Sequence, residues 1–220
     1  MKKAVIFDFD GTLADTLPVC FYAFQQVFRK FDSTELSSEE IKAMFGPSET
    51  GIIRNNLTHE SKDEAIELYY DMYLKHHDEL VKNDQDIDDL LTHLKEEGYQ
   101  LGIVTGKARR SLDISLAALQ MENFFDVIMT GDDVDNPKPH PEGIFMALHL
   151  LGIKNEEALF IGDSEADILA GLAAKVTTIG VHWLPEYQTE DFTVQPDRMF
   201  KSVKEFQEAF SRKWSITKSL

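Results

Sequence analysis

The stretch VIFDFDGTLAD at residues 5–15 decides how the rest of the chain is interpreted. An apolar run leads into Asp8 and Asp10, which are two residues apart and are followed by Gly11. Apolar runs without polar alternation are typical of strands that are buried on both faces of a parallel sheet. Carboxylates held this close repel one another, so the stretch predicts that a cation offsets their charge.

The composition indicates a globular protein with a strong acidic excess. The chain has 220 residues, 43% of them hydrophobic, which predicts one substantial core or a core domain carrying a smaller inserted domain. Asp and Glu outnumber Lys and Arg by 39 to 22, and the formal net charge is −17. Because such a charge repels phosphate backbones and anionic lipid, we expect neither a nucleic acid nor a membrane as partner.

The cysteine content and the apolar segments indicate a cytoplasmic protein. Cys20 is the single cysteine, so no disulfide can form within the chain, and a reducing compartment is expected. Asp8 and Asp10 interrupt the apolar run after the basic start, which argues against a signal peptide. The sequence does not set the oligomeric state, and a monomer is the starting assumption.

Short apolar runs alternate with helical patterns along the chain. This alternation predicts an α/β fold, a Rossmann-like parallel sheet with right-handed crossovers and helices on both faces. The five predicted strands are residues 4–7, 101–104, 127–129, 159–161 and 176–181.

One connection is much longer than a crossover requires. About seventy residues separate the first strand from the helix near Ile87, and their pattern is helical throughout. We therefore predict an inserted α-helical cap domain at residues 15–82, placed over the end of the first strand. Residues 1–14 and 83–220 form the predicted catalytic core.

Polar side chains follow the predicted strands where the carboxyl ends meet at one edge of the sheet. Clustered carboxylates need a cation, and hard oxygen ligands suit Mg²⁺. Asp8 and Asp163 are the predicted direct ligands, with the backbone carbonyl of Asp10 as a further one. The residues expected at this edge are Asp8, Asp10, Thr105, Gly106, Lys138, Asp163 and Asp167.

Two other motifs, the calcium-binding EF-hand loop and the phosphate-binding Walker loop, do not match the residues at the required spacing. An EF-hand loop starting at Asp8 lacks an oxygen ligand of the required type at Thr12 and a glutamate at Val19. A Walker loop ending at Lys107 lacks a glycine at Leu101.

Four motifs in this order resemble the signatures of the haloacid dehalogenase-like hydrolase superfamily, over nearly the whole chain. They are Asp8-x-Asp10-Gly11-Thr12, the strand-ending Thr105, the Lys138 loop, and Gly162-Asp163-Ser164 with Asp167. With its predicted helical cap, the chain is most similar to the branch of phosphoglycolate phosphatases and pyrophosphatases. The second aspartate separates it from the dehalogenase and phosphonatase branches, because an alkoxide leaving group needs an acid.

The resemblance implies a role for each motif. Asp8 corresponds to a nucleophile that forms an aspartyl-phosphate, and Asp10 to the acid that protonates the leaving oxygen and then activates water. The implied phosphate-binding residues are Gly11, Thr105, Gly106 and Lys138. The implied metal-binding residues are Asp8, Asp10, Asp163 and Asp167.

A turn inside the insert, FGPSE at residues 45–49, is expected to reach toward the catalytic edge. Ser48, Glu49 and Arg54 are the predicted specificity residues. Helix capping and ordinary surface charge explain the same residues equally well.

The sequence thus predicts a Mg²⁺-dependent phosphohydrolase of a small phosphorylated metabolite, such as phosphoglycolate. A pyrophosphatase and a sugar-phosphate mutase resembling β-phosphoglucomutase are the alternatives. A catalytically silent phosphate-binding protein is disfavoured because the motif residues are intact.

Overall fold

The computed structural model describes residues 2–213, with side chains described for residues 2–210. One sheet of six parallel strands forms its centre, in the order β3-β2-β1-β4-β5-β6. The strands are β1 (Ala4–Phe7), β2 (Gln100–Val104), β3 (Val127–Met129), β4 (Ala158–Gly162), β5 (Thr177–Val181) and β6 (Arg198–Phe200).

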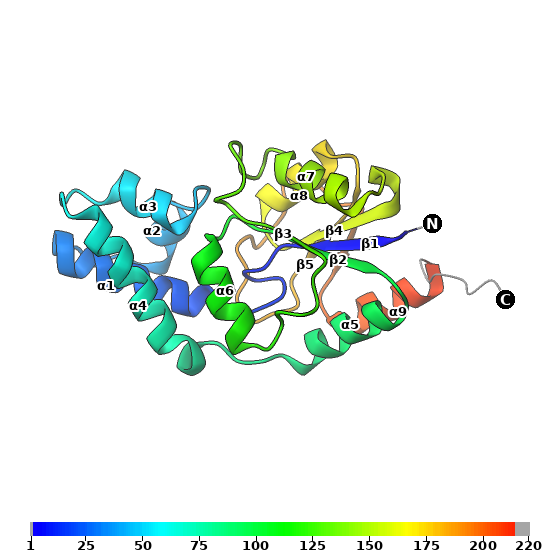
Figure 1. Cartoon of the computed structure of the whole chain (residues 1–220), viewed down its shortest axis with the longest axis horizontal. Coiled ribbons are helices and arrows are strands. Elements are labelled where there is room, and N and C mark those ends of the chain that lie inside the picture. The colour runs from blue at the N-terminus through cyan, green and yellow to red at the C-terminus, as the bar shows by residue number, and fades with distance from the viewer. Residues whose placement is uncertain (1, 214–220) are drawn as a thin grey trace.

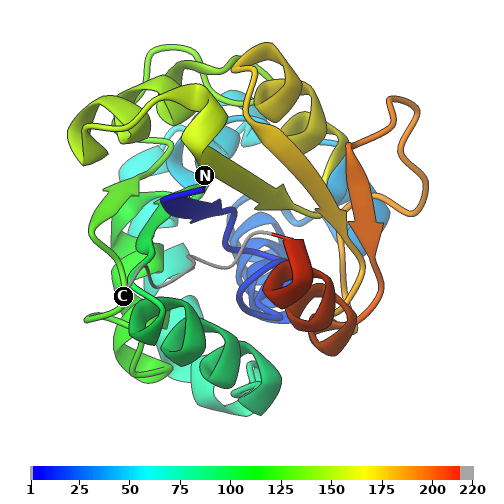
Figure 2. The same ribbon diagram turned by 90° about the vertical axis from the view of Figure 1, so that its right-hand side faces the viewer.

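Helices cover both faces of this sheet, as the predicted α/β class requires. Figure 2 shows α5 and α9 on one face and α7 and α8 on the other. These elements are α5 (Gln85–Glu96), α6 (Arg109–Ala118), α7 (Glu142–Leu151), the short 3₁₀ helix η1 (Asn155–Glu157), α8 (Glu165–Ala173) and α9 (Val203–Lys213).

The central strand β1 positions the functional edge. All four of its residues are buried, because neighbouring strands pair on both sides and helices cover both faces. Phe7 lies beside Ile103 of β2 and Ile161 of β4. The residues that follow β1 and β4 therefore emerge side by side at the carboxyl edge.

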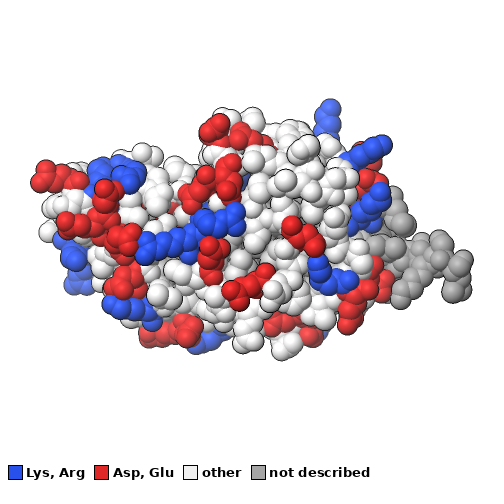
Figure 3. Space-filling model, in the orientation of Figure 1, with Lys and Arg blue, Asp and Glu red and all other residues white. Residues whose placement is uncertain are grey.

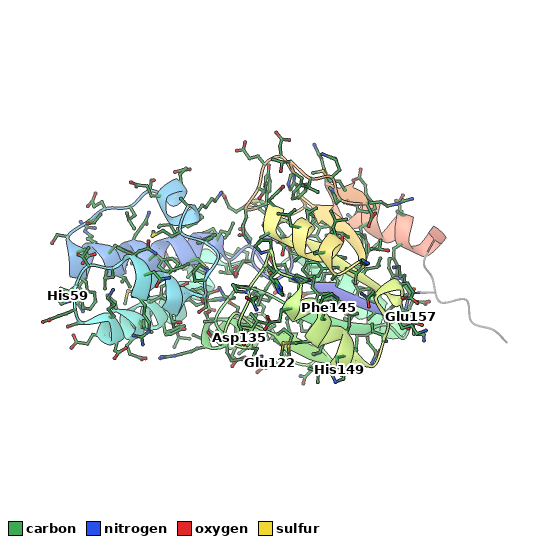
Figure 4. The ribbon with its side chains drawn as sticks, turned by 90° about the horizontal axis from the view of Figure 1, so that it is seen from above. His59, Glu122, Asp135, Phe145, His149 and Glu157 are labelled. Carbon is green, nitrogen blue, oxygen red and sulfur yellow. The ribbon has the colours of Figure 1, made fainter. Side chains whose placement is uncertain are left out.

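Four helices lie between β1 and α5 in sequence and gather at one end of the molecule (Figure 1). They are α1 (Leu17–Asp32), α2 (Ser38–Lys42), α3 (Glu49–Asn56) and α4 (Lys62–Leu80). α1 packs along α4, where the ring centroids of Phe24 and Tyr69 are 4.6 Å apart. Figure 4 shows His59 at the outer end of this group and Glu157 near the opposite end of the molecule.

The predicted fold class is confirmed, and all five predicted strands are present. The sixth strand, β6, was not predicted, because its three residues include two exposed ones and give no apolar run. Among the described helices, none combines the length and the apolar character that crossing a membrane requires. On the face drawn in Figure 3, Lys and Arg side chains are scattered among the Asp and Glu side chains.

Candidate active site

Three aspartates from separate elements meet at the carboxyl edge of the sheet. Asp8 follows β1, Asp163 follows β4, and Asp167 lies in the first turn of α8. One carboxylate oxygen from each lies within 4.8 Å of the other two. We refer to Asp8, Asp163 and Asp167 as the acidic cluster. Its members are almost completely buried, so their charges repel one another with little screening by water.

Two glycines make this close approach possible. Gly11 has a φ of +81°, which glycine adopts without steric cost. A Cβ atom on Gly11 would collide with the carboxylate of Asp163, and one on Gly162 would collide with the side chain of Asp167. The glycines of the two aspartate motifs therefore serve the packing of the acidic cluster.

Lys138 is the cation that contacts the cluster. Its Nζ lies 2.8 Å from Oδ1 of Asp8 and donates a hydrogen bond to Oδ1 of Asp167. The contact with Asp8 is an ion pair without the alignment of a hydrogen bond, so Asp8 Oδ1 has no hydrogen-bond partner within the described residues. One ammonium group thus pairs with two of the three carboxylates, and the cluster keeps an excess of negative charge.

Burial and mutual repulsion shift the proton affinities of the cluster. Burial, followed by the charge of Asp167, raises the pKa of Asp8 to about 7, although Lys138 acts in the opposite direction. Burial and the neighbouring carboxylates also raise the pKa of Asp163 well above its usual range. A bound divalent cation would reverse both effects by stabilising the ionised forms.

The remaining oxygens of the cluster are held by neutral donors. Asp163 accepts hydrogen bonds from the Thr12 hydroxyl at 3.1 Å and from the Gln188 backbone N–H at 2.6 Å. Asp167 accepts from the backbone N–H of Ser164 at 3.0 Å and from its hydroxyl at 2.6 Å, closing a capping box at the start of α8. These bonds orient both carboxylates.

The donor set fits a hard divalent cation. It offers closely spaced carboxylate oxygens, one of them without a hydrogen bond, and the backbone carbonyl of Asp10 lies on the adjoining turn. That carbonyl accepts a 3.3 Å hydrogen bond from Nε2 of Gln188. In proteins, Mg²⁺ is bound by oxygen atoms, commonly those of one or two carboxylates together with water.

Asp10 is held apart from the cluster by a buried lysine. Its Oδ1 accepts a hydrogen bond from the Thr16 hydroxyl and lies 3.0 Å from Nζ of Lys107. The same Nζ lies 3.3 Å from Oε1 of Glu49 and 4.6 Å from the centroid of the Tyr73 ring. Burial disfavours the charged form of Lys107, but the acidic groups around it, Asp10 first, hold its pKa well above the usual range.

Glu49 connects the inserted helices to the core. It is the first residue of α3, and its carboxylate accepts hydrogen bonds from the Ala108 backbone N–H and the Ser111 hydroxyl, both at 2.5 Å. Ala108 precedes α6 immediately, so Glu49 occupies the start of that helix, where a negative charge is favoured. Glu49, Lys107, Ala108 and Ser111 are called the α3–α6 junction below.

A cavity of about 100 Å³ lies between the carboxyl edge of the sheet and the helices that follow β1. Core residues form one wall and helices α1 and α3 with the FGPSE turn form the other. The lining residues are Asp8, Asp10, Leu17, Cys20, Phe24, Phe45, Gly46, Pro47, Glu49, Ile52, Thr105, Gly106, Lys107, Lys138, Ser164, Ala166 and Gln188.

Some of the predicted site residues meet at this cavity and others do not. Thr105, Gly106 and Lys138 line it together with Asp8 and Asp10. The N–H of Gly11 instead donates to the carbonyl of Ala14 at 2.9 Å.

Of the predicted specificity residues, only Glu49 reaches the cavity lining. Ser48 precedes α3, with its hydroxyl 3.1 Å from that of Thr50. Arg54 pairs with Asp63 at 2.7 Å, and more than half of its side chain is exposed.

Lys107 and Gln188 are cavity residues that the sequence analysis did not assign to the site. Lys107 follows the second strand directly, and its position at a strand end was the available signal. Its partner Glu49 is 58 positions away, so their contact requires the folded chain. Gln188 lies in a polar loop after β5 whose sequence carries no pattern that indicates a site.

The fold and this edge define an α/β enzyme with an acidic site at the carboxyl ends of parallel strands. The family model of haloacid dehalogenase-like hydrolases matches residues 5–181. The chain therefore belongs to the haloacid dehalogenase-like hydrolase family, as its motifs predicted. It is a hydrolase, and the phosphatase type expected from the motifs agrees with its named relatives.

Relatives with curated names are similar over nearly the full length. A pyrophosphatase PpaX of Bacillus mycoides is 33% identical over 210 residues, which cover 96% of this chain and 97% of the relative. The PpaX of Bacillus cereus strain AH820 is 34% identical over 203 residues, 92% of this chain and 94% of the relative.

Solved structures share the fold. CbbY from Rhodobacter sphaeroides, crystallised with phosphate, is similar with a TM-score of 0.82 and 24% identity, over 94% of this chain and 96% of that one. A predicted phosphoglycolate phosphatase from Haemophilus somnus 129pt has a TM-score of 0.81 and 20% identity, over 94% and 97% of the chains.

Proposed function

We propose that the protein is a Mg²⁺-dependent phosphohydrolase that cleaves a small phosphorylated metabolite through an aspartyl-phosphate on Asp8. The observation that carries this proposal is the acidic cluster with Lys138 against it. Three buried carboxylates facing one ammonium group leave a negative excess that a divalent cation offsets. A cation beside a nucleophilic carboxylate also neutralises the charge of an incoming phosphoryl group.

Asp8 is the proposed nucleophile and Asp10 the proposed acid and base. A carboxylate oxygen of Asp8 attacks phosphorus, the bond to the leaving oxygen breaks, and Asp10 gives that oxygen its proton. Water then attacks phosphorus and passes a proton to Asp10, which releases inorganic phosphate and restores Asp8. Both residues line the cavity, which supports this division of roles.

The other edge residues bind and position the phosphoryl group in this proposal. Lys138 offsets the charges of Asp8 and of the phosphoryl oxygens, and Thr105 with the Gly106 backbone N–H provides neutral donors. Asp163 and Asp167 hold Mg²⁺ together with Asp8 and the Asp10 carbonyl, and the ion adds electrostatic stabilisation of phosphoryl charge. The hydrogen bonds that orient Asp163 and Asp167 support their part.

Residues 15–82 are the proposed cap, which closes over the bound metabolite and excludes bulk water. The apolar residues that α1 and α3 contribute to the cavity support this function. From the sequence alone, the cytoplasm is the proposed compartment, with the small metabolite as the partner.

A pyrophosphatase is the second candidate. It is favoured by the name of the relatives that are 33% and 34% identical to this chain over nearly its full length. The core chemistry would be the same, with phosphate in place of an alcohol as the leaving group.

Hydrolysis of p-nitrophenyl phosphate tests the proposed function. We expect turnover with Mg²⁺, none after chelation with EDTA, and recovery when Mg²⁺ is restored. The Asp8→Asn variant removes the proposed nucleophile. Its activity should fall below about a hundredth of the wild-type value. Hydrolysis that is unaffected by EDTA or by Asp8→Asn would contradict the proposal.

A further inference from the structure

The α3–α6 junction places two carboxylates against one ammonium group at the cavity wall. Lys107 is buried with its side chain 0% exposed, and it faces Asp10 at 3.0 Å and Glu49 at 3.3 Å. Glu49 is further engaged by the Ala108 backbone N–H and the Ser111 hydroxyl. The start of α6, which would otherwise favour an anionic ligand, is thus filled by the protein's own carboxylate.

The cations of the cavity are all matched by protein carboxylates. Among the described residues that line the cavity, Lys107 and Lys138 are the only Lys or Arg residues. Lys138 lies between Asp8 and Asp167, and Lys107 lies between Asp10 and Glu49. The phosphoryl group takes the Lys138 side, so a second anionic group would meet no cation of its own.

The rest of the insert's wall is apolar. Leu17 and Phe24 of α1, Ile52 of α3, and Phe45 of the FGPSE turn face the same cavity. All but Phe45 are buried, with at most 3% of their surface exposed. These apolar side chains give no hydrogen bonds to replace the hydration of an ionised group.

We propose that this site selects phosphate monoesters whose leaving group is compact and uncharged, with Glu49 as the residue that excludes a second anionic group. This inference rests on the proposed phosphohydrolase function and narrows its substrate class. A carboxylate or a second phosphoryl group at the leaving-group position would be desolvated beside the Glu49 carboxylate. Such a buried, unpaired charge is strongly unfavourable, so we expect phosphoglycolate and pyrophosphate to be poor substrates, which opposes the pyrophosphatase candidate.

The test compares two substrates that differ in one charge. Phosphoglycolate and its amide, phosphoglycolamide, have nearly the same size and the same leaving oxygen, but only the first carries a carboxylate. We expect kcat/KM of the wild type to be at least about tenfold higher for the amide, the ratio that a 1.4 kcal/mol difference produces. Pyrophosphate should be hydrolysed more slowly than the amide.

The Glu49→Gln variant tests whether Glu49 excludes a second anionic group. The substitution keeps the size and an acceptor oxygen for the Ala108 N–H, but it removes one of the two carboxylates that pair with Lys107 and so reduces the repulsion of an anionic leaving group. We expect the ratio of kcat/KM for the amide over phosphoglycolate to fall about tenfold. Glu64→Gln, the same change at an exposed position of α4, is the matched control and should leave the ratio unchanged.

The outcomes separate this inference from the proposed function. If none of phosphoglycolate, its amide, pyrophosphate and p-nitrophenyl phosphate is hydrolysed, the phosphohydrolase function fails. If any of them is hydrolysed but the wild type prefers phosphoglycolate or pyrophosphate over the amide, only the selection of uncharged leaving groups is overturned. An unchanged ratio in a folded Glu49→Gln variant would overturn the role of Glu49, and the wild-type comparison stands even if that variant does not fold.

Discussion

The acidic cluster and the α3–α6 junction both bury several charges, yet they differ in charge balance. The cluster sets three carboxylates against Lys138 and leaves an oxygen of Asp8 without a hydrogen bond. The junction sets Asp10 and Glu49 against Lys107, and neutral donors complete the shell around Glu49. The cluster has the larger excess of negative charge, which suits it to bind a cation. The hydrogen bonds from Ala108 and Ser111 to Glu49 suit the junction to join two parts of the fold.

The largest expected change in thermal stability concerns the α3–α6 junction. Lys107→Met would leave the carboxylates of Asp10 and Glu49 buried without their cation, a change that costs about 3–5 kcal/mol in other proteins. We expect the Tm to fall by about 10 °C, and Mg²⁺ should not restore it. Thermal unfolding followed by circular dichroism measures both.

Lys75→Met is the matched control for this comparison. Lys75 pairs with Asp71 at 2.7 Å on the surface of α4, with 59% of its side chain exposed. Exposed pairs of this kind contribute little, so the Tm should change by about 1 °C or less. Similar decreases in Tm for Lys107→Met and Lys75→Met would mean that the buried pairs of Lys107 stabilise the fold no more than an exposed ion pair does.

A smaller change in thermal stability is expected from the acidic cluster when Mg²⁺ is removed. The pKa of Asp8 is raised to about 7 in the folded protein, so its protonated form stabilises the fold at low pH. This stability is complete below the unfolded pKa and is lost as the pH rises through 7.

In EDTA, the Tm of the wild type relative to Asp8→Asn should therefore fall by about 5 °C between pH 5 and pH 8. Addition of Mg²⁺ at pH 8 should reverse the loss in the wild type alone. A Tm difference that stays constant across this range would show that Asp8 does not titrate in the folded protein.

The two regions also differ in how far the sequence predicts them. The cluster was predictable because Asp8 and Asp163 each follow an apolar run, Asp167 lies one helical turn after Asp163, and parallel strands bring their carboxyl ends to one edge. The alternation of runs and helical patterns likewise predicted the α/β class, whereas the three-residue β6 gave no apolar run to detect.

The junction was not predictable in the same way. Glu49 was predicted as a specificity residue, and the sequence did not predict that its carboxylate is also engaged by Lys107, Ala108 and Ser111, which follow the second strand. No periodicity links a turn in the insert to the start of α6, because that contact depends on how the insert packs on the core. Arg54, predicted alongside Glu49, pairs with Asp63 of α4 and does not line the cavity.

Calorimetric titration with Mg²⁺ tests the central claim, that Asp8, Asp163 and Asp167 form one metal site, most directly. The measurement compares the wild type with Asp163→Asn near neutral pH, each first freed of metal with EDTA. We predict saturable binding of Mg²⁺ in the wild type and loss of that binding in Asp163→Asn, because one carboxylate ligand is replaced by a neutral amide. Equal binding in the two proteins would contradict the assignment of the metal site to the carboxyl edge of β1 and β4.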